Sequence, residues 1–340
     1  MRLFKQIFAL VITTLFIGIM NPVTASAVDS STAQGLQISP AKVELNAATG
    51  NTYSIKLTVT NVTSSELIYS SEISDFKASG ENGSPKIMID KTMPASASVR
   101  SWISSVPEFT LGAHESKAIY AEITIPDDAE PGGHYGVLSF SGATPEMSGT
   151  GVGLSASTGV IMLIKVDGDI TEKASLSSFY SGKLDNQSFF FETGPIPFIV
   201  RIKNEGNIHI QPVGTIEIRD MFGSTVSSVP VNSSKANVLP DSIRRFGGTG
   251  SDSISMPNKG FMIGLYTAQL TLGYGSTGQA VTSSISFWVI PYRAILIILL
   301  VLGTIVYIVT KIIKAHNKRI IEKYKNENGN KNQNKKNHKK

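Results

Sequence analysis

The chain has 340 residues, no cysteine, 31 Lys and Arg against 26 Asp and Glu, and a net charge of +5. Without cysteine it has no disulfide framework, no lipid-modified N-terminal cysteine and no cysteine-based metal site or nucleophile. The positive charge belongs to the ends, because residues 28–292 carry 17 Lys or Arg and 24 Asp or Glu, a net charge of −7. This distribution argues against binding to nucleic acid.

The N-terminus has the three parts of a secretory signal peptide. Arg2 and Lys5 form a basic region, residues 7–20 are uncharged and largely apolar, and small residues follow. The apolar run of 14 residues is shorter than the roughly 17 to 25 that a spanning helix needs. We therefore predict a signal peptide over residues 1–27, cleaved after Ala27, with cleavage after Ala25 as the alternative.

A second apolar segment lies near the C-terminus. Residues 294–310 lack charge and consist mainly of Ile, Leu and Val, and they cover about 25 Å as a helix. We predict a transmembrane helix over residues 291–313, with Pro291 in its first turn. Trp288 and Tyr292 stand where interfacial aromatic residues are usual.

The segment after this helix, residues 314–340, is predicted to be a basic cytoplasmic tail. From Lys311 onward the chain has 11 Lys or Arg and two Glu, and such an excess marks the cytoplasmic side of a membrane helix. The predicted localisation is therefore the cell membrane, with a single pass and an ectodomain outside.

The 263 residues between the two apolar segments have the pattern of β-strands. Apolar and polar residues alternate over residues 53–59 and 119–125, and no stretch keeps a helical period. Further strands are expected over residues 160–166, 189–191, 198–202, 208–218, 262–272 and 281–290. The length suits two domains of ordinary size.

An internal duplication supports two similar domains. Pro126 is followed nine residues later by Tyr135, and Pro257 is followed nine residues later by Tyr266, each tyrosine with a glycine two residues before it. In immunoglobulin-like sandwiches a tyrosine at the start of strand F closes a corner through its hydroxyl group. We predict that Tyr135 and Tyr266 are such corner residues.

Two strand patterns also end in asparagine, at Asn61 and Asn204, whose side chains can cap a turn. Turn residues cluster at 167–169, where we place the domain boundary. The predicted fold class is all-β, with two tandem immunoglobulin-like β-sandwich domains over residues 28–168 and 169–290. Long loops are expected over residues 77–115 and 144–153, and loops on a rigid sandwich often bind ligands.

Two sequence motifs typical of cofactor binding or catalysis lack the secondary structure that they require. Residues 273–278 match the G-x-G-x-x-G pattern, but a strand follows where a dinucleotide site needs a helix, so a hairpin turn is expected. Ser39 and Lys42 match S-x-x-K without the helix that this nucleophile requires. An acidic group around Asp127 and Asp128 is expected to be a solvated loop. We predict no enzyme activity, no cofactor and no metal site.

Trp102 is the one candidate ligand-binding residue in the first predicted domain. An indole ring can stack on a sugar and orient it through its N–H group. The same ring can instead plug the end of the sandwich. Both roles stay open at this point.

The first half of the ectodomain resembles bacterial WxL-interacting proteins over roughly residues 36–167. The residues that carry the resemblance are Arg100-Ser101-Trp102, Pro107-Glu108, Leu111, Glu115-Ser116, residues 123–126 and residues 129–136. The resemblance implies an immunoglobulin-like domain that engages peptidoglycan and a second one that contacts a surface-layer partner. It implies no catalytic residues. Residues 204–209 and 214–218 look instead like other bacterial surface sandwiches.

Three functions follow as hypotheses, because a sandwich fold alone does not determine function. The first is a membrane-anchored binding or scaffold protein for peptidoglycan or a surface protein. The second is a chaperone-like assembly factor that binds client strands at a sheet edge, as pilus chaperones do. The third is an enzyme, for which no catalytic group can be assembled.

Overall fold

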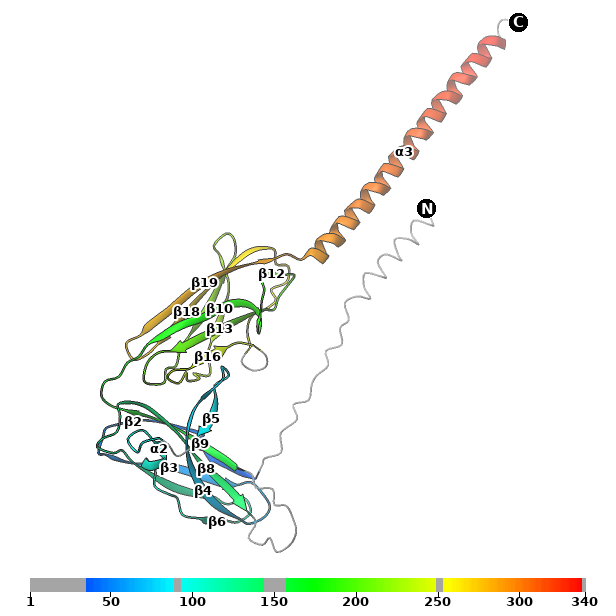
Figure 1. The fold of residues 1–340 in the computed structure, drawn as a ribbon. Coiled ribbons are helices and arrows are strands. Elements are labelled where there is room, and N and C mark those ends of the chain that lie inside the picture. The colour runs from blue at the N-terminus through cyan, green and yellow to red at the C-terminus, as the bar shows by residue number, and fades with distance from the viewer. Residues whose placement is uncertain (1–34, 89–92, 144–156, 249–252, 338–340) are drawn as a thin grey trace.

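The computed structural model describes residues 35–88, 93–143, 157–248 and 253–337. Two immunoglobulin-like β-sandwiches follow each other along the chain, and one long C-terminal helix leaves the second (Figure 1). The predicted fold class is confirmed. The predicted signal peptide over residues 1–27 lies outside the described residues.

The first sandwich, domain 1, packs a three-stranded sheet against a six-stranded sheet. The smaller sheet has the order β1 (Leu36–Ser39), β3 (Thr52–Asn61) and β7 (Ser116–Thr124). The larger has the order β2 (Lys42–Ala47), β9 (Ser157–Val166), β8 (Gly132–Ala143), β4 (Leu67–Ser79) and β5 (Ser84–Met88), with β6 (Phe109–Leu111) also on β4. The chain changes sheet between β1 and β2, where Pro40 has no N–H group to continue a ladder.

Alternation places the core of domain 1 as the sequence predicts. Leu57 and Val59 on β3 and Ile119 and Ile123 on β7 are buried, while their polar neighbours face outward. Burial of each such side chain contributes about 1.5–3 kcal/mol to the hydrophobic stabilisation. The predicted strands over residues 53–59 and 119–125 are therefore confirmed.

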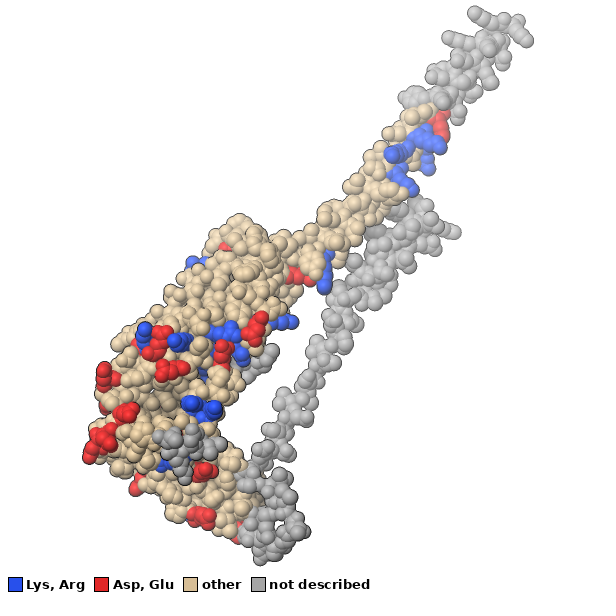
Figure 2. Space-filling model, viewed as in Figure 1, with Lys and Arg blue, Asp and Glu red and all other residues tan. Residues whose placement is uncertain are grey.

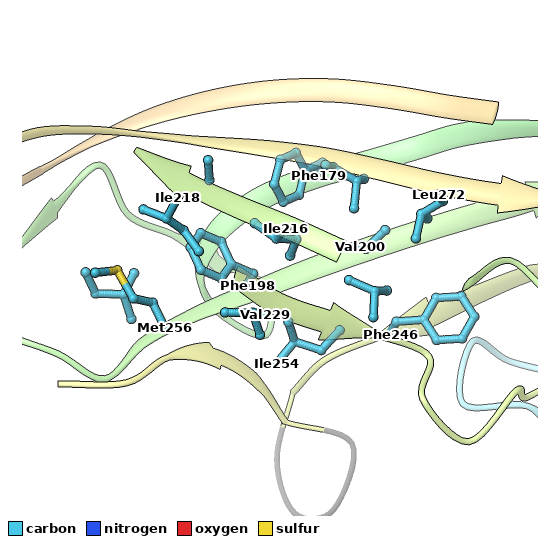
Figure 3. Close-up of a cluster of buried hydrophobic side chains, with 14 of the residues drawn as sticks. Phe179, Phe198, Val200, Ile216, Ile218, Val229, Phe246, Ile254, Met256 and Leu272 are labelled. Carbon is cyan, nitrogen blue, oxygen red and sulfur yellow. The ribbon is translucent and has the colours of Figure 1, made fainter. Parts of the chain in front are cut away.

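The second sandwich, domain 2, packs two five-stranded sheets. One contains β11 (Asn186–Gln187), β10 (Ala174–Lys183), β13 (Ile196–Asn204) and β16 (Ile243–Phe246), with β17 (Ile254–Met256) also on β13. The other has the order β12 (Phe190–Phe191), β19 (Gln279–Val289), β18 (Gly264–Tyr274), β14 (Val213–Arg219) and β15 (Thr225–Val231). Phe198, Ile216 and Leu272 meet between the sheets (Figure 3).

Two predicted segments differ from the structure. Residues 77–115 hold the end of β4, β5, a short helix α2 (Val99–Trp102) and β6, where a long loop was expected. The strand expected over residues 208–218 begins only at Val213, because residues 206–211 turn around the side chain of Asn204.

The C-terminal helix α3 (Tyr292–Asn337) has 46 residues. Its part from Tyr292 to Glu322 is long and apolar enough to cross a membrane. The helix continues through the segment predicted as a tail, which contains no proline or other helix breaker apart from Gly329.

Candidate functional site

Trp102 lies inside domain 1. Its side chain is 2% exposed, its indole Nε1 donates to the carbonyl of Ala95 at 2.7 Å, and its ring centroid is 4.5 Å from that of His134. An indole enclosed in this way has no free face for a sugar ring. The prediction of a ligand-stacking Trp102 is therefore corrected: the ring fills the core beneath α2.

The short helix that carries Trp102 is held by a buried carboxylate. Ser98 Oγ and the backbone N–H of Arg100 donate to the two oxygens of Asp75, at 2.5 and 3.1 Å. The Arg100 side chain donates to the carbonyls of Ile73 and Met88. The Arg-Ser-Trp segment is thus part of the framework of domain 1.

Tyr135 joins the two domains and does not close a corner within domain 1. It lies on the outer face of the larger sheet, where its hydroxyl is 3.4 Å from Nδ1 of His209 in domain 2. The absence of a side chain on Gly133 leaves space for that hydroxyl. Burial raises the pKa of Tyr135, so the phenol stays protonated. The corner prediction is corrected for this residue.

Tyr266 faces the core of domain 2. Its side chain is buried, and its ring stacks on Phe287 with centroids 5.9 Å apart. Among the described residues its hydroxyl has no hydrogen-bond partner, and Tyr266 contributes to domain 2 through the packing of its ring in the core. The corner prediction is corrected here too.

Polar contacts fix domain 1 against domain 2. The Arg201 side chain of domain 2 donates to Glu81 at 2.6 Å, and the N–H of Arg245 donates to the Glu81 carbonyl at 2.7 Å. The N–H of Gly133 donates to the carbonyl of Asn207 at 2.8 Å. Figure 1 shows the hairpin of β4 and β5 reaching from domain 1 to β16.

Apolar contacts and two cavities accompany these bonds. Phe76, Val137 and Leu163, on the outer face of the larger sheet, pack against Leu239 of domain 2. Beside them lie cavities of about 660 and about 270 Å³, both lined by residues of the two domains. Acidic and basic side chains mix along the face of this junction that Figure 2 shows.

Two titratable groups at the junction have shifted pKa values. Burial lowers the pKa of His209. Partial burial acts to raise the pKa of Glu44, but hydrogen bonds from Lys42 and Asn237 hold it below its usual value. Since Glu44 also accepts from Gln211 at 3.0 Å, it is a second carboxylate of domain 1 bound to domain 2.

The first half of β9 forms an open sheet edge. β2 pairs with β9 only from Lys42 opposite Ile161 onward, and β8 pairs along its other side. The N–H of Ile161 donates toward β2, so by alternation Ser157 and Gly159 aim their backbone groups at the same side. Among the described strands none pairs with that side of residues 157–160.

A row of half-buried apolar side chains lies next to this edge. They are Leu36 and Ile38 of β1, which pack against the core without being enclosed by it. Val43 and Leu45 of β2 continue the row along the paired half of β9, opposite Met162 and Ile164. β1 also lies close to β9 without pairing with it. The edge therefore combines free backbone groups with apolar side chains.

The glycine pattern at residues 273–278 forms the turn between β18 and β19, as predicted. Within the described part of the chain, no three His, Asp or Glu side chains lie close enough together to hold a metal ion. The acidic loop around Asp127 and Asp128 is among these described residues and forms no such group.

Sequence reasoning missed the junction, and its hypothesis of a strand-binding sheet edge did not say which edge. Glu81 and Arg201 are 120 positions apart, and no local pattern connects them. A signal for the edge was present, because the alternation of β9 continues upstream in the sequence as Val152, Leu154 and Ala156.

No family model matches the chain, and no curated protein matches it. Among solved structures it is similar to the class 5 fimbriae chaperone CfaA, with 12% identity, a TM-score of 0.38, and 73% of this chain and 98% of that chain covered. It is also similar to the E. coli chaperone DraB, with 14% identity, a TM-score of 0.35 and coverages of 74% and 96%. A third similar structure is the complex of the Salmonella enterica SafA pilin with the SafB chaperone. Its identity is 12% and its TM-score is 0.35, with 76% of this chain and 99% of that chain covered. Likenesses of this degree carry no argument about what this chain binds.

Proposed function

We propose that this chain is a membrane-tethered binding protein that captures an extended segment of an exported surface protein on the free edge of β9. The observation that carries the proposal is the unpaired side of residues 157–160 next to a half-buried apolar row. An extended peptide can add a strand there, gaining affinity from main-chain hydrogen bonds and specificity from alternate side chains.

The anchor is the helix α3, with both sandwiches on the outer side of the membrane and the basic tail in the cytoplasm. The apolar character of residues 292–322 supports the anchor. The excess of Lys and Arg after the helix supports the orientation. Such an anchor tethers domain 1, and with it the binding edge, to the membrane through domain 2.

Two other sheet edges are less suited to pairing. The outer side of β7 is partly occupied, because the Glu122 carbonyl accepts from the N–H of Ser104 at 2.9 Å. The edge strand β15 contains Pro230, which has no N–H group and discourages strand addition.

Binding of peptidoglycan by domain 1 stays a prediction of the family resemblance. Its named contact, Trp102, is enclosed in the core, so no described aromatic face supports it at that position. An extended surface-protein segment is the partner that the free edge favours.

The proposal is tested with the full chain in lipid nanodiscs and nine-residue peptides that tile the exported proteins of the same cell. Binding is measured by fluorescence anisotropy. We expect a subset of peptides to bind, and we expect Ser157→Pro to abolish their binding, because proline removes the outward N–H at the first position of β9.

Ser157→Ala is the matched control, since it keeps the N–H and changes only an exposed hydroxyl. It should bind the same peptides with unchanged affinity. Equal binding by the proline and alanine variants, or no binding of any peptide to the unchanged chain, would rule the proposed edge out.

A further inference from the structure

Large apolar side chains gather, exposed, at the end of domain 2 from which α3 leaves. They come from three separate connections, and Phe222, Phe190 and Phe261 are 85%, 66% and 67% exposed. We call the set the apolar rim: Phe189, Phe190, Met221, Phe222, Phe261 and Ile263.

Strand register places these connections at one end of the domain. Gly264 at the start of β18 lies opposite Val289 at the end of β19, and Arg219 at the end of β14 lies opposite Thr267. The turn after β14 and the loop before β18 are therefore neighbours, and the Met221 methyl group packs over Gly264. β12 pairs with the last residues of β19 and adds Phe189 and Phe190 to the same end. In Figure 1 this end is the one remote from domain 1.

The joint between this end and α3 is short and well held. Only Ile290 and Pro291 separate β19 from the helix. Pro291 is buried, the N–H of Ile290 donates to the carbonyl of Phe191 at 2.8 Å, and Arg293 pairs with Glu192 at 3.4 Å. The position of the helix in a bilayer therefore determines how far the apolar rim lies from the bilayer surface.

The position of the apolar segment brings the joint to the bilayer surface. The predicted transmembrane helix, residues 291–313, spans about 34 Å, enough to cross a hydrocarbon core about 30 Å thick, so the helix begins at the membrane surface directly after the joint. Trp288 and Tyr292, 42% and 55% exposed, then lie at the level of the headgroups, as interfacial aromatic residues do.

The charges near the rim suit a headgroup layer. Lys259, in the loop before β18, is exposed. The carboxylate of Asp220 is engaged by its own turn, since it accepts from the N–H groups of Phe222 and Ser224 at 2.9 Å. Figure 2 shows few charged side chains on the face of domain 2 next to the helix.

We propose that the apolar rim inserts into the headgroup region of the bilayer that α3 crosses, on the side of the sandwiches. This inference rests on the proposed membrane anchor. Aromatic and aliphatic side chains with a nearby lysine are the chemistry that binds the surface of a membrane. Domain 2 then rests on the membrane, and the edge of β9 is held at a fixed height and orientation above it.

The absence of cysteine allows a direct test with single spin labels. The variants Phe222→Cys, Phe261→Cys, Tyr120→Cys and Ile297→Cys are made in the full chain, labelled, and reconstituted in vesicles of phosphatidylcholine and phosphatidylglycerol. Tyr120, 63% exposed on domain 1, is the control in water, and Ile297 is the control in hydrocarbon. Collision rates with oxygen and with a water-soluble nickel chelate are measured.

We expect labels at Phe222 and Phe261 to collide with nickel several-fold less often than the label at Tyr120, and more often with oxygen. Nickel accessibility equal to that at Tyr120, with Ile297 in hydrocarbon, would overturn the rim insertion and leave the anchor intact. A water-accessible Ile297 would overturn both. Dipolar broadening between labels at Phe222 that disappears when labelled chains are diluted with unlabelled ones would show a second copy on the rim and would also overturn the proposal.

Discussion

Two buried asparagines hold equivalent turns in the two domains. The side-chain amide of Asn61 donates to the carbonyls of Ser65, Leu111 and Gly112, and its oxygen accepts from Thr63. Asn204 ends β13 in the same way, with donation to Ile208 and Val238 and acceptance from Gly206. Each amide is fully enclosed and replaces backbone partners that the turning chain would otherwise lack.

The first prediction concerns these asparagines. Asn61→Ala should destabilise domain 1, and Asn204→Ala domain 2, each by roughly 2–4 kcal/mol, because two or more buried carbonyls or N–H groups lose their partner. Residue-resolved hydrogen exchange of the full chain in micelles reads each domain separately. The exposed Asn46→Ala and Asn186→Ala are the controls and should change little. Equal effects from buried and exposed replacements would show that the turns do not depend on these bonds.

The sequence predicted the role of the asparagines but misjudged the tyrosines for a reason at this same scale. Tyr135 and Tyr266 align without a gap, yet Tyr135 faces outward from β8 whereas Tyr266 faces inward on β18. A shift of one residue in a strand exchanges its two faces. Spacing in the sequence records the distance from proline to tyrosine and not the face on which the tyrosine lies.

At the scale of elements, the short helix α2 explains why Trp102 is a core residue and not a ligand contact. The indole lies beneath the helix, and Asp75 holds the helix N-terminus. Sequence periodicity could not predict the four-residue helix, because it makes little more than one turn and shows no repeat of the helical period. It predicted the long strands β3, β7, β9 and β19, whose alternation extends over several residues.

The second prediction follows from this packing. Trp102→Ala should destabilise domain 1 by about 3–5 kcal/mol, the usual cost of removing a large buried aromatic side chain. Trp288→Ala, which removes a 42% exposed indole, should leave domain 1 unchanged. Hydrogen exchange on the full chain measures both. An intact domain 1 after Trp102→Ala would mean that the indole is not a core residue and would restore it as a ligand contact.

At the scale of the whole molecule, the junction between the domains is where the sequence was least informative. Glu44, Glu81 and Tyr135 come from separate strands or turns of domain 1, and their partners lie far along the chain in domain 2. Alternation along one strand identifies an outward face but not what covers it. The junction therefore required the three-dimensional structure.

The third prediction concerns pH. Above about pH 6.5, the usual pKa of histidine, His209 is neutral whether or not the domains are docked. As the pH falls below that value, the undocked ring takes up a proton that the docked ring resists, because burial lowers its pKa; Lys42 and Lys165 add to this shift and Glu44 opposes it. The docked arrangement therefore loses stability as the pH falls from 6.5 toward 5.

Undocking of the domains can be followed by placing one spin label in each domain, at Tyr120→Cys and Thr282→Cys, and measuring the distribution of distances between the two labels. The distribution should broaden between pH 7.5 and pH 5, and His209→Gln should suppress most of the change. A His209→Gln chain that broadens as much as the unchanged one would show that another group controls the junction.

The central claim, that a partner strand pairs with the free edge of β9, is tested most directly by hydrogen exchange at one amide. The N–H of Gly159 aims at the open side, and in the chain alone it should exchange readily. When a peptide that binds in the anisotropy assay is added in excess, we predict that the Gly159 amide becomes strongly protected, because it donates to the added strand. Binding that protects other residues while Gly159 exchanges as before would contradict the account.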